Sequence, residues 1–212
     1  MSHPIQIDYY TDPLCSWCFA AEPMLNQVKA HFQDKIELHY KLFPLFESLR
    51  EVMNDPSRLW TIADRYRIVS KKTGVSINNS VWQTDPPQSA WPACLAVKAA
   101  EQQGLDAADR FIKQLRINVM REGKNIARTD VQVAAAEAVG LIRGCFEQDL
   151  LSPKRKEAVE ADIASAQKEN VESRPHFVLT NTQGDKVSIA GPRIFSLFKE
   201  AVDALYHEQP EI

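Results

Sequence analysis

The sequence predicts a mixed α/β protein in which one small α/β domain is interrupted by a long helical block. Three observations support this prediction: residues 1–46 follow a strand–helix–strand order, residues 171–212 follow a strand–strand–helix order, and residues 47–170 have helical periodicity. The two ends together supply the elements of one complete domain. We therefore expect residues 1–46 and 171–212 to form a discontinuous domain, and residues 47–170 to form an inserted helical subdomain.

The first strand is expected at Ile5–Tyr10, where β-branched and aromatic residues alternate with polar ones. Apolar residues at helical spacing predict a helix at Phe19–Phe32, and Glu37–Phe43 has the composition of a second strand, which Pro44 ends. The motif Cys15-Ser16-Trp17-Cys18 lies between the first strand and this helix. We therefore expect the two cysteines at the start of the helix.

The inserted block is expected to contain several helices separated by turn residues. The predicted helices are Leu59–Tyr66, Ser89–Gly104, Asp106–Arg121, Thr129–Gly140, Arg143–Leu150 and Pro153–Glu169, and residues 77–88 are predicted as a loop. Thr129 and Gln132 have the spacing of a capping box. After the block, strands are predicted at Phe177–Thr180 and Val187–Ile189, and a last helix at Arg193–Tyr206.

Composition and charge exclude several classes of function. The chain of 212 residues carries 25 basic and 28 acidic residues, mixed along its length, for a net charge of −3. Because this pattern leaves no large basic face, we expect neither nucleic acid nor an anionic membrane as a partner. No run of about 18 apolar residues predicts a membrane span. The start of the chain, Met1–Ile5, has no export signal, so a cytoplasmic location is expected.

The Cys15–Cys18 motif predicts thiol–disulfide chemistry. Two thiols separated by two residues at a helix start can close a small disulfide. Unpaired N–H groups and the helix dipole favour negative charge there, so we expect a lowered pKa for Cys15, which would be the nucleophile. Cys18, one helical turn further, would resolve the mixed disulfide. Asp12 lies close in sequence and opposes formation of the Cys15 thiolate.

Two alternatives remain for the motif on spacing alone. In the first, Cys15 and Cys18 would be half of a zinc site, and two residues from among Cys94, Cys145 and the five histidines would complete it. Neither remaining cysteine stands in a second motif of this kind. The cysteines are otherwise two inert buried residues. We expect no metal.

The chain resembles the DsbA-like thioredoxin superfamily, and within it the FrnE-like branch of proteins assigned as protein disulfide isomerases. The resemblance spans nearly the whole chain and rests on the motif residues 12–18, Glu22-Pro23, the helical insertion, and Pro175 before a strand. It implies a thioredoxin-like fold, with Cys15 as nucleophile and Cys18 as resolving thiol. It also implies that Pro175 is a cis proline facing the cysteines.

Two departures from the family pattern bear on substrate binding. Ser16 and Trp17 stand between the cysteines, where Pro-Trp or Pro-His is commoner, so the direction of electron flow stays open. Arg174 places a cation before Pro175. It would stabilise the Cys15 thiolate or bind an acidic substrate such as a glutathione carboxylate, or it is simply solvated.

Aromatic residues supply a further expectation. Trp91, together with Trp17, Trp82, Phe43 and Phe46, would line an apolar substrate surface, although aromatic residues at such spacings more often belong to the core.

Other polar residues near the motif have two interpretations each. Cys94 is either a core residue or the partner of Cys15 in a regulatory disulfide, and Cys145 is a packing residue. Asp8 either accepts a proton from Cys18 or faces solvent, and His176 either contacts the site or points away from it.

The expected function is a dithiol–disulfide oxidoreductase or isomerase acting on protein or low-molecular-weight disulfides. No cofactor is expected beyond the redox-active cysteines, with glutathione as a candidate co-substrate. One alternative is an adaptor of the same fold that presents proteins for degradation. The other is a glutathione-dependent isomerase or transferase, against which the intact cysteine pair argues. Oligomeric state is not predicted.

Overall fold

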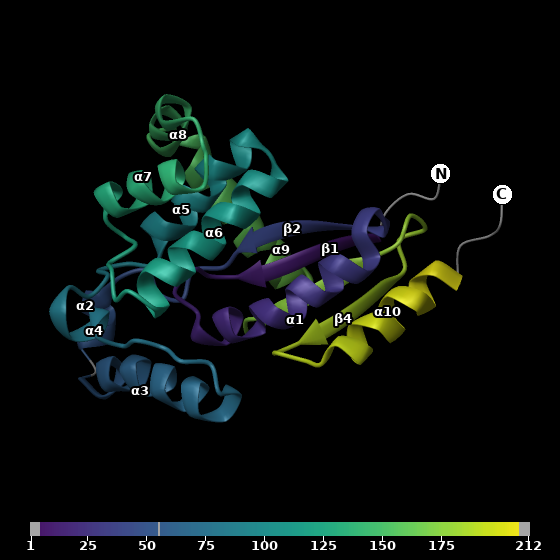
Figure 1. The fold of residues 1–212 in the computed structure, drawn as a ribbon, viewed down its shortest axis with the longest axis horizontal. Coiled ribbons are helices and arrows are strands. Elements are labelled where there is room, and N and C mark those ends of the chain that lie inside the picture. Colours follow the sequence, from purple (N-terminus) through teal and green to yellow (C-terminus); the bar gives the residue numbers. More distant parts are fainter. Residues whose placement is uncertain (1–4, 55, 208–212) are drawn as a thin grey trace.

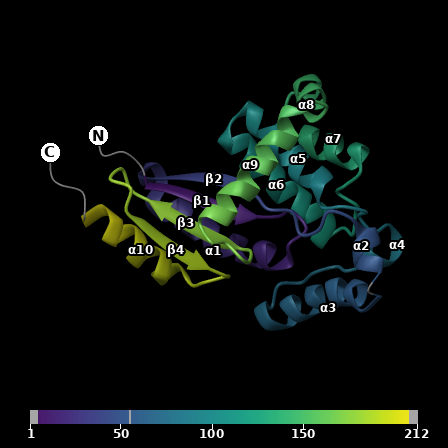
Figure 2. The ribbon, with the colours of Figure 1, turned by 180° about the vertical axis from the view of Figure 1, so that it is seen from behind.

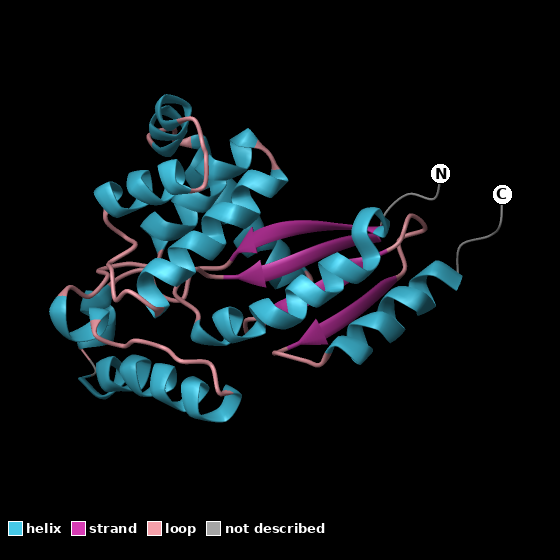
Figure 3. Cartoon of the chain, viewed as in Figure 1, coloured by secondary structure: helices cyan, strands magenta, loops and turns pink. Residues whose placement is uncertain are grey.

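The computed structural model describes residues 5–54 and 56–207, and its centre is a four-stranded sheet with the order β2-β1-β3-β4 (Figures 1 and 3). Its strands are β1 (Ile5–Thr11), β2 (Ile36–Leu42), β3 (His176–Thr180) and β4 (Lys186–Ala190). β1 and β2 are parallel, whereas β3 is antiparallel to both β1 and β4. The predicted α/β class and the order of elements at both ends of the chain are therefore confirmed.

Helices cover both faces of this sheet. α1 (Ser16–Phe32) and α10 (Phe195–His207) lie on one face in Figure 1, and α9 (Lys154–Lys168) crosses the other face in Figure 2. On the α1 face, Tyr9 stacks on Phe177 with ring centroids 4.4 Å apart, and Phe177 meets Phe198 edge to face. Because strand side chains alternate between faces, these aromatic rings fill the core under α1 and α10.

The remaining helices lie between β2 and β3 in the chain. They are α2 (Leu49–Met53), α3 (Pro56–Thr73), α4 (Val81–Thr84), α5 (Trp91–Ala100), α6 (Leu105–Met120), α7 (Thr129–Ala138) and α8 (Arg143–Leu150), followed by α9; short 3₁₀ turns span Gln33–Lys35 and Glu101–Gln103. In Figure 1, α5–α8 gather beyond the ends of β1 and β2, and α3 lies apart from them. The division into a discontinuous domain and a subdomain stays a prediction, since one hydrophobic cluster includes residues from the sheet and the insertion.

Two charged side chains attach the inserted helices to β2, which is an edge strand. Lys98 of α5 donates its Nζ to the Tyr40 carbonyl at 2.9 Å, and the Leu42 N–H donates to the Asp162 carboxylate of α9 at 2.7 Å. Lys98 and Asp162 are themselves an ion pair at 2.9 Å, with 7% exposure of each side chain. Backbone groups that lack a neighbouring strand are thereby paired, as buried polar groups require.

Several local predictions differ from the structure. α1 begins at Ser16 rather than Phe19, and α4 occupies part of the segment 77–88 that was expected to be a loop. The capping box at Thr129 is wrong: Arg128 is the residue before α7, and the Gln132 side chain donates to the Ile126 carbonyl at 2.8 Å. Tertiary contact with the preceding loop outweighs the local cap. Among the described residues, no helix combines the length and apolar character that a bilayer crossing needs.

Candidate redox site

Cys15 and Cys18 lie at the N-terminus of α1, where the loop after β1 turns into the helix. Cys15 is the N-cap residue, and its Sγ accepts a hydrogen bond from the Cys18 N–H at 3.4 Å. The Cys15 N–H donates in turn to the Asp12 carbonyl at 3.1 Å, which closes the turn. Both thiols are free; Cys15 is 5% exposed and Cys18 is fully buried. The sulfur atoms thus stand in different surroundings, although they are one helical turn apart.

The segment before β3 reaches the same point from far along the chain. The Arg174–Pro175 peptide bond is cis, and the Cys15 Sγ lies 3.8 Å from the Arg174 carbonyl oxygen. Because β1 and β3 are antiparallel neighbours in the sheet, the loop after β1 and the loop before β3 meet at the same end of these strands. The structure therefore brings together three of the predicted site residues, Cys15, Cys18 and Pro175, whose chemical roles stay predictions.

A groove of about 510 Å³ opens beside Cys15. Its lining combines apolar and charged side chains: Leu14, Cys15, Ser16, Trp17, Leu45, Phe46, Ile62, Arg65, Tyr66, Glu172, Ser173 and Arg174. Ser16, Trp17 and Arg174 were predicted to contact substrate, and all three lie here. Trp91 was predicted with them, but the structure places it at the start of α5, half-buried and outside the groove lining.

Arg174 is half-buried on the wall of this groove. Its guanidinium carbon lies 4.1 Å from the centroid of the Phe43 ring, which is a close cation–π contact. Its Nη2 also donates to the Pro44 carbonyl at 3.5 Å, and its Nε has no hydrogen-bond partner in the described structure. Arg174 is therefore held in place by the loop after β2 rather than fully solvated.

Asp12 supports the Cys15 loop from inside the protein. Its buried carboxylate accepts the Leu14 N–H at 2.6 Å and the Leu45 N–H at 2.7 Å, so it ties the cysteine loop to the loop after β2. Burial raises the pKa of Asp12, although Arg174 and the two backbone donors partly offset this effect. Tyr66 of α3 adds a second tie, since its hydroxyl donates to the Leu14 carbonyl at 2.8 Å.

A buried group of four side chains, which we name the Arg116 cluster, lies around Cys18: Tyr9, Thr11, Glu22 and Arg116. Arg116 of α6 is fully buried, forms an ion pair with Glu22 of α1, and donates to the Thr11 hydroxyl. Its guanidinium carbon lies 5.8 Å from the centroid of the Tyr9 ring. The sequence alone did not single out Glu22 or Arg116 as site residues facing Cys18.

The pKa values of Cys15 and Cys18 are shifted in opposite directions. Burial raises the pKa of Cys15 well above its usual value, and the hydrogen bond with Cys18 raises it further. Burial acts in the same direction on Cys18, but the hydrogen bond with Cys15, the charge of Arg116 and the Thr11 hydroxyl lower its pKa to about 7. The lowered Cys15 pKa that the helix start predicts is thus opposed in the reduced protein. The cause is that Cys15 is buried here beside a carboxylate, with the cation on the Cys18 side.

The other polar residues near the motif lie away from the two sulfur atoms. Asp8 sits on the sheet face opposite Tyr9, 3.9 Å from Lys41, so the interpretation as proton acceptor of Cys18 is wrong. His176 is directed to Ser188, at 2.7 Å from its Oγ.

The two remaining cysteines lie on different helices. Cys94 of α5 is buried, with its sulfur 3.8 Å from the Asp12 carboxylate, and Cys145 of α8 is exposed. Within residues 5–54 and 56–207, no three His, Cys, Asp or Glu side chains converge as a metal ion would require.

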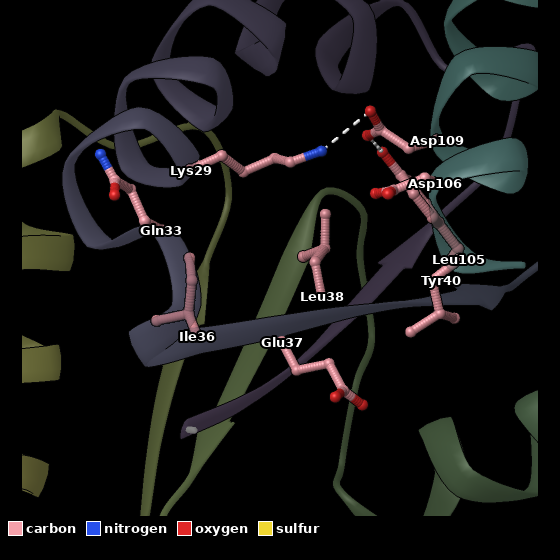
Figure 4. Close-up of a pocket in the computed structure, with 9 residues that line it drawn as sticks. All are labelled: Lys29, Gln33, Ile36, Glu37, Leu38, Tyr40, Leu105, Asp106 and Asp109. Carbon is pink, nitrogen blue, oxygen red and sulfur yellow. Dashed lines mark hydrogen bonds and ion pairs between the residues drawn. The ribbon is translucent and has the colours of Figure 1, made fainter. Parts of the chain in front are cut away.

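A second hollow of about 300 Å³ lies between α1, β2 and α6 and contains no cysteine (Figure 4). Figure 4 shows Leu38 pointing toward Lys29 and Asp109, whereas Glu37 points to the other side of β2. Asp109 receives hydrogen bonds from Tyr40 at 2.7 Å and from Lys113 at 3.0 Å, and pairs with Lys29 at 2.8 Å. Burial raises the pKa of Asp109, but these donors outweigh burial and lower it overall. The Asp109 carboxylate thus has its hydrogen-bond and ion-pair partners within the chain.

Comparison with known proteins identifies the family. A family model described as thioredoxin matches residues 9–200, which include both cysteines and Pro175. The chain belongs to the thioredoxin family. The predicted thioredoxin-like fold is therefore confirmed.

Curated relatives within this thioredoxin family carry the name ClpXP adapter protein SpxH. The protein from Halalkalibacterium halodurans is 26% identical over 98% of this chain and 70% of its own length. The protein from Shouchella clausii is 29% identical over 94% of this chain and 66% of its own length. About a third of each relative thus has no counterpart in this chain.

Solved structures of DsbA-like members of the thioredoxin family share the fold. A protein from Nitrosomonas europaea, provisionally named a protein disulfide isomerase, has a TM-score of 0.82 at 16% identity, over 98% of this chain and 100% of its own. The cytosolic disulfide reductase DsbM from Pseudomonas aeruginosa with GSH has a TM-score of 0.67 at 16% identity, over 95% and 96%. A variant of alpha-DsbA1 from Wolbachia pipientis has a TM-score of 0.63 at 14% identity, over 98% and 88%. The predicted likeness in fold to DsbA-like proteins is confirmed, and the FrnE-like branch stays a prediction.

Proposed function

We propose that this thioredoxin-family protein is a thiol–disulfide oxidoreductase that reacts through Cys15. The observation that carries the proposal is the position of Cys15 as N-cap of α1, with its sulfur beside the groove and against the Arg174 carbonyl. The backbone N–H groups at this helix end are suited to hold a thiolate or the sulfur atoms of a disulfide. Cys18 is within one turn, where a second thiol can complete the exchange.

The reaction follows two exchange steps. The Cys15 thiolate attacks one sulfur of a substrate disulfide, so that a Cys15–substrate bond forms and the other half of the substrate leaves as a thiolate. Cys18 then attacks the Cys15 sulfur, the bond to the substrate breaks, and the Cys15–Cys18 disulfide forms. The substrate disulfide is reduced to two thiols while the protein dithiol is oxidised. A reductant of the thiol class must restore the dithiol for the next cycle.

The groove supports peptide or low-molecular-weight disulfides as substrates. Phe46, Ile62 and Trp17 offer apolar surface next to Cys15, and Arg65 and Arg174 offer positive charge. Such a mixture suits a peptide that carries a carboxylate near its disulfide. Glutathione is a natural candidate co-substrate, because the structurally similar DsbM is described with GSH. We propose no further cofactor, no nucleic-acid or membrane partner, and a cytoplasmic location.

The test is turnover of defined disulfides by the purified chain. We expect reduction of insulin and of a glutathionylated peptide in the presence of a thiol reductant, and no reduction above the buffer rate with Cys15→Ser. Cys145→Ser is the matched control, since Cys145 is exposed on α8 and should leave the rate unchanged. Equal rates for the Cys15→Ser variant and the unmodified chain would contradict the proposal.

A second candidate function is a protein adaptor, which the names of the curated relatives favour. In that case the groove and the inserted helices would bind a client protein, and the cysteines would be dispensable. The two functions separate in one comparison. Capture of a client from lysate that is undiminished when both cysteines are replaced, together with no disulfide turnover, supports the adaptor; turnover that depends on Cys15 supports the oxidoreductase.

A further inference from the structure

The Arg116 cluster is an unusual use of charge in a protein core. Arg116 has no exposed surface, and Glu22 is 9% exposed. Burying two charges costs several kcal/mol per ion, and a pair of this kind stabilises a protein only when its remaining polar atoms are also hydrogen-bonded. Here they are not: the Arg116 Nε, the second Glu22 carboxylate oxygen and the Tyr9 hydroxyl have no partner in the described structure. Stability alone therefore does not account for the cluster.

The cluster is connected to Cys18 by position. Glu22 follows Cys18 by four residues in α1, so the two side chains share one face of the helix. Arg116 pairs with Glu22 and donates to the Thr11 hydroxyl, so its guanidinium is held against a side chain that lies one helical turn from Cys18. Neither Arg116 nor Glu22 lines the groove, so a substrate beside Cys15 does not reach them. An arginine cannot give up its proton in a protein, which makes Arg116 a permanent cation next to a buried thiol.

We propose that Arg116 is a positioning residue for the second exchange step. Held by Glu22 and Thr11, its guanidinium stabilises the thiolate that Cys18 must form before it can release the bound substrate. The inference rests on the proposed function, and it makes α6, a helix of the inserted block, part of the redox machinery.

The step balances as follows. The Cys18 thiol releases its proton to solvent, and the thiolate attacks the Cys15 sulfur of the mixed disulfide. The Cys15–Cys18 bond forms, the bond between Cys15 and the substrate breaks, and the substrate sulfur leaves as a thiolate that takes up one proton from solvent. Arg116 stays protonated throughout. In the dithiol, the hydrogen bond with Cys15 is the largest cause that lowers the Cys18 pKa, followed by the charge of Arg116. Once Cys15 is bonded to substrate it has no S–H to donate, and the charge of Arg116 remains.

Several titratable groups face Cys18 and the cation from the surrounding elements. Besides Arg116 itself, they are Cys15 at the start of α1, Glu22 of α1, Tyr9 of β1, Tyr40 of β2, and Asp12 of the loop after β1. Burial raises the pKa values of both tyrosines, so these stay neutral around pH 7. A pH profile near neutrality therefore reports the thiols.

The experiment separates the two exchange steps with an aromatic disulfide, 5,5′-dithiobis(2-nitrobenzoate). In a Cys145→Ser background, attack by Cys15 releases the first coloured thiolate and resolution by Cys18 releases the second, so stopped-flow absorbance gives two phases. With Arg116→Met we expect the first phase to keep its rate within about twofold. The second should slow about tenfold at pH 7, with its pH midpoint raised by about one unit, because only the thiolate attacks. Arg116→Lys keeps the charge and should restore most of the second-phase rate.

Arg155 provides a matched control. It is also a buried arginine of the inserted block with an unpartnered Nε, but its Nη1 donates to the Lys98 carbonyl in a different part of the core. Arg155→Met should leave both phases unchanged. Equal slowing of the second phase by Arg155→Met and Arg116→Met, or no slowing by Arg116→Met, overturns the inference. Absence of the first phase in the background protein overturns the proposed function instead.

A double variant guards against a failure to fold. Glu22→Leu with Arg116→Met removes the cation without leaving an unpaired carboxylate in the core, and such replacements are often tolerated. If Arg116→Met does not fold, the double variant takes its place. A slow second phase supports the inference, and a second phase at the original rate overturns it.

Discussion

Cys15 and Cys18 share one turn of helix, yet the structure gives them opposite surroundings. Cys15 meets a groove on one side and the buried carboxylate of Asp12 on the other. Cys18 is sealed in the core, where the charge of Arg116 lowers its pKa. The position that borders the groove thus has an anion behind it, and the sealed position has a cation. Access to substrate and stabilisation of charge are divided between the two sulfur atoms.

This division gives each thiol a distinct task. Burial and the nearby carboxylate oppose ionisation of Cys15, whereas the helix N-terminus favours its thiolate. Cys15 is also the sulfur that a substrate disulfide in the groove can reach. A sealed thiol beside a cation ionises readily, but it can react only with a sulfur already attached to Cys15. Attack and resolution are therefore controlled by different residues, and each can be changed separately.

The largest expected effect comes from the two cysteines themselves. Cys15→Ser should reduce disulfide turnover by about 10³-fold or more, the range typical for loss of a nucleophile. Cys18→Ser should also stop turnover, but for another reason, since Cys15 still attacks and the mixed disulfide accumulates. Mass spectrometry after incubation with oxidised glutathione checks the difference. A glutathione adduct on Cys18 in the Cys15→Ser protein would contradict the assignment of tasks.

A second effect concerns stability on the Cys18 side. Arg116→Ala leaves the Glu22 carboxylate buried without its partner, which should lower the free energy of unfolding by about 3–5 kcal/mol. The double change of Glu22→Leu and Arg116→Met should recover much of that loss, because no charge remains in the core. Urea denaturation followed by circular dichroism measures both. A double variant as unstable as Arg116→Ala would show that packing, rather than charge, holds this part of the core.

Two carboxylates predict opposite dependence on pH. Asp12 has a raised pKa in the folded protein, so its contribution to stability is greatest at low pH and is lost as the pH rises from 3.8 through the folded value. Asp109 has a lowered pKa, so its contribution is present above 3.8 and is lost as the pH falls through the folded value. The stability difference between the unmodified chain and Asp12→Asn, measured by urea denaturation across this pH range, should therefore shrink with rising pH, and that for Asp109→Asn should grow. Slopes of the same sign for both variants would contradict this prediction.

The smallest effect on stability is expected from the hydrogen bond that joins Tyr66 of α3 to the cysteine loop. Tyr66→Phe removes the hydroxyl that donates to the Leu14 carbonyl, at a cost of about 1 kcal/mol in unfolding free energy. The exposed hydrogen bond from Tyr206 to the Lys35 carbonyl is the matched control, and Tyr206→Phe should cost less because water replaces the hydroxyl. Thermal denaturation compares the two. A larger loss for Tyr206→Phe would reverse the expected order.

The sequence allowed the prediction of those features that depend on local pattern. The strands and the place of Cys15 at a helix start follow from alternation, spacing and turn residues, whereas the cis geometry of Pro175 was implied only by the family resemblance. The Arg116 cluster does not, since Glu22 and Arg116 are 94 residues apart and meet only through the packing of α6 on α1. One signal was available: Arg116 follows Ile112 by four residues, so it falls on the apolar face of a helix. A charge in that position indicates a buried partner, which only the fold identifies.

The contacts of Lys98 and Asp162 with β2 have a consequence for assembly between molecules. An edge strand with free backbone groups invites a strand from another molecule, which is a common route to aggregation. Here the Tyr40 carbonyl and the Leu42 N–H are already bonded to side chains of α5 and α9. The inserted helices therefore cover β2 near its C-terminal end, and another strand cannot pair with these two backbone groups unless α5 and α9 move away.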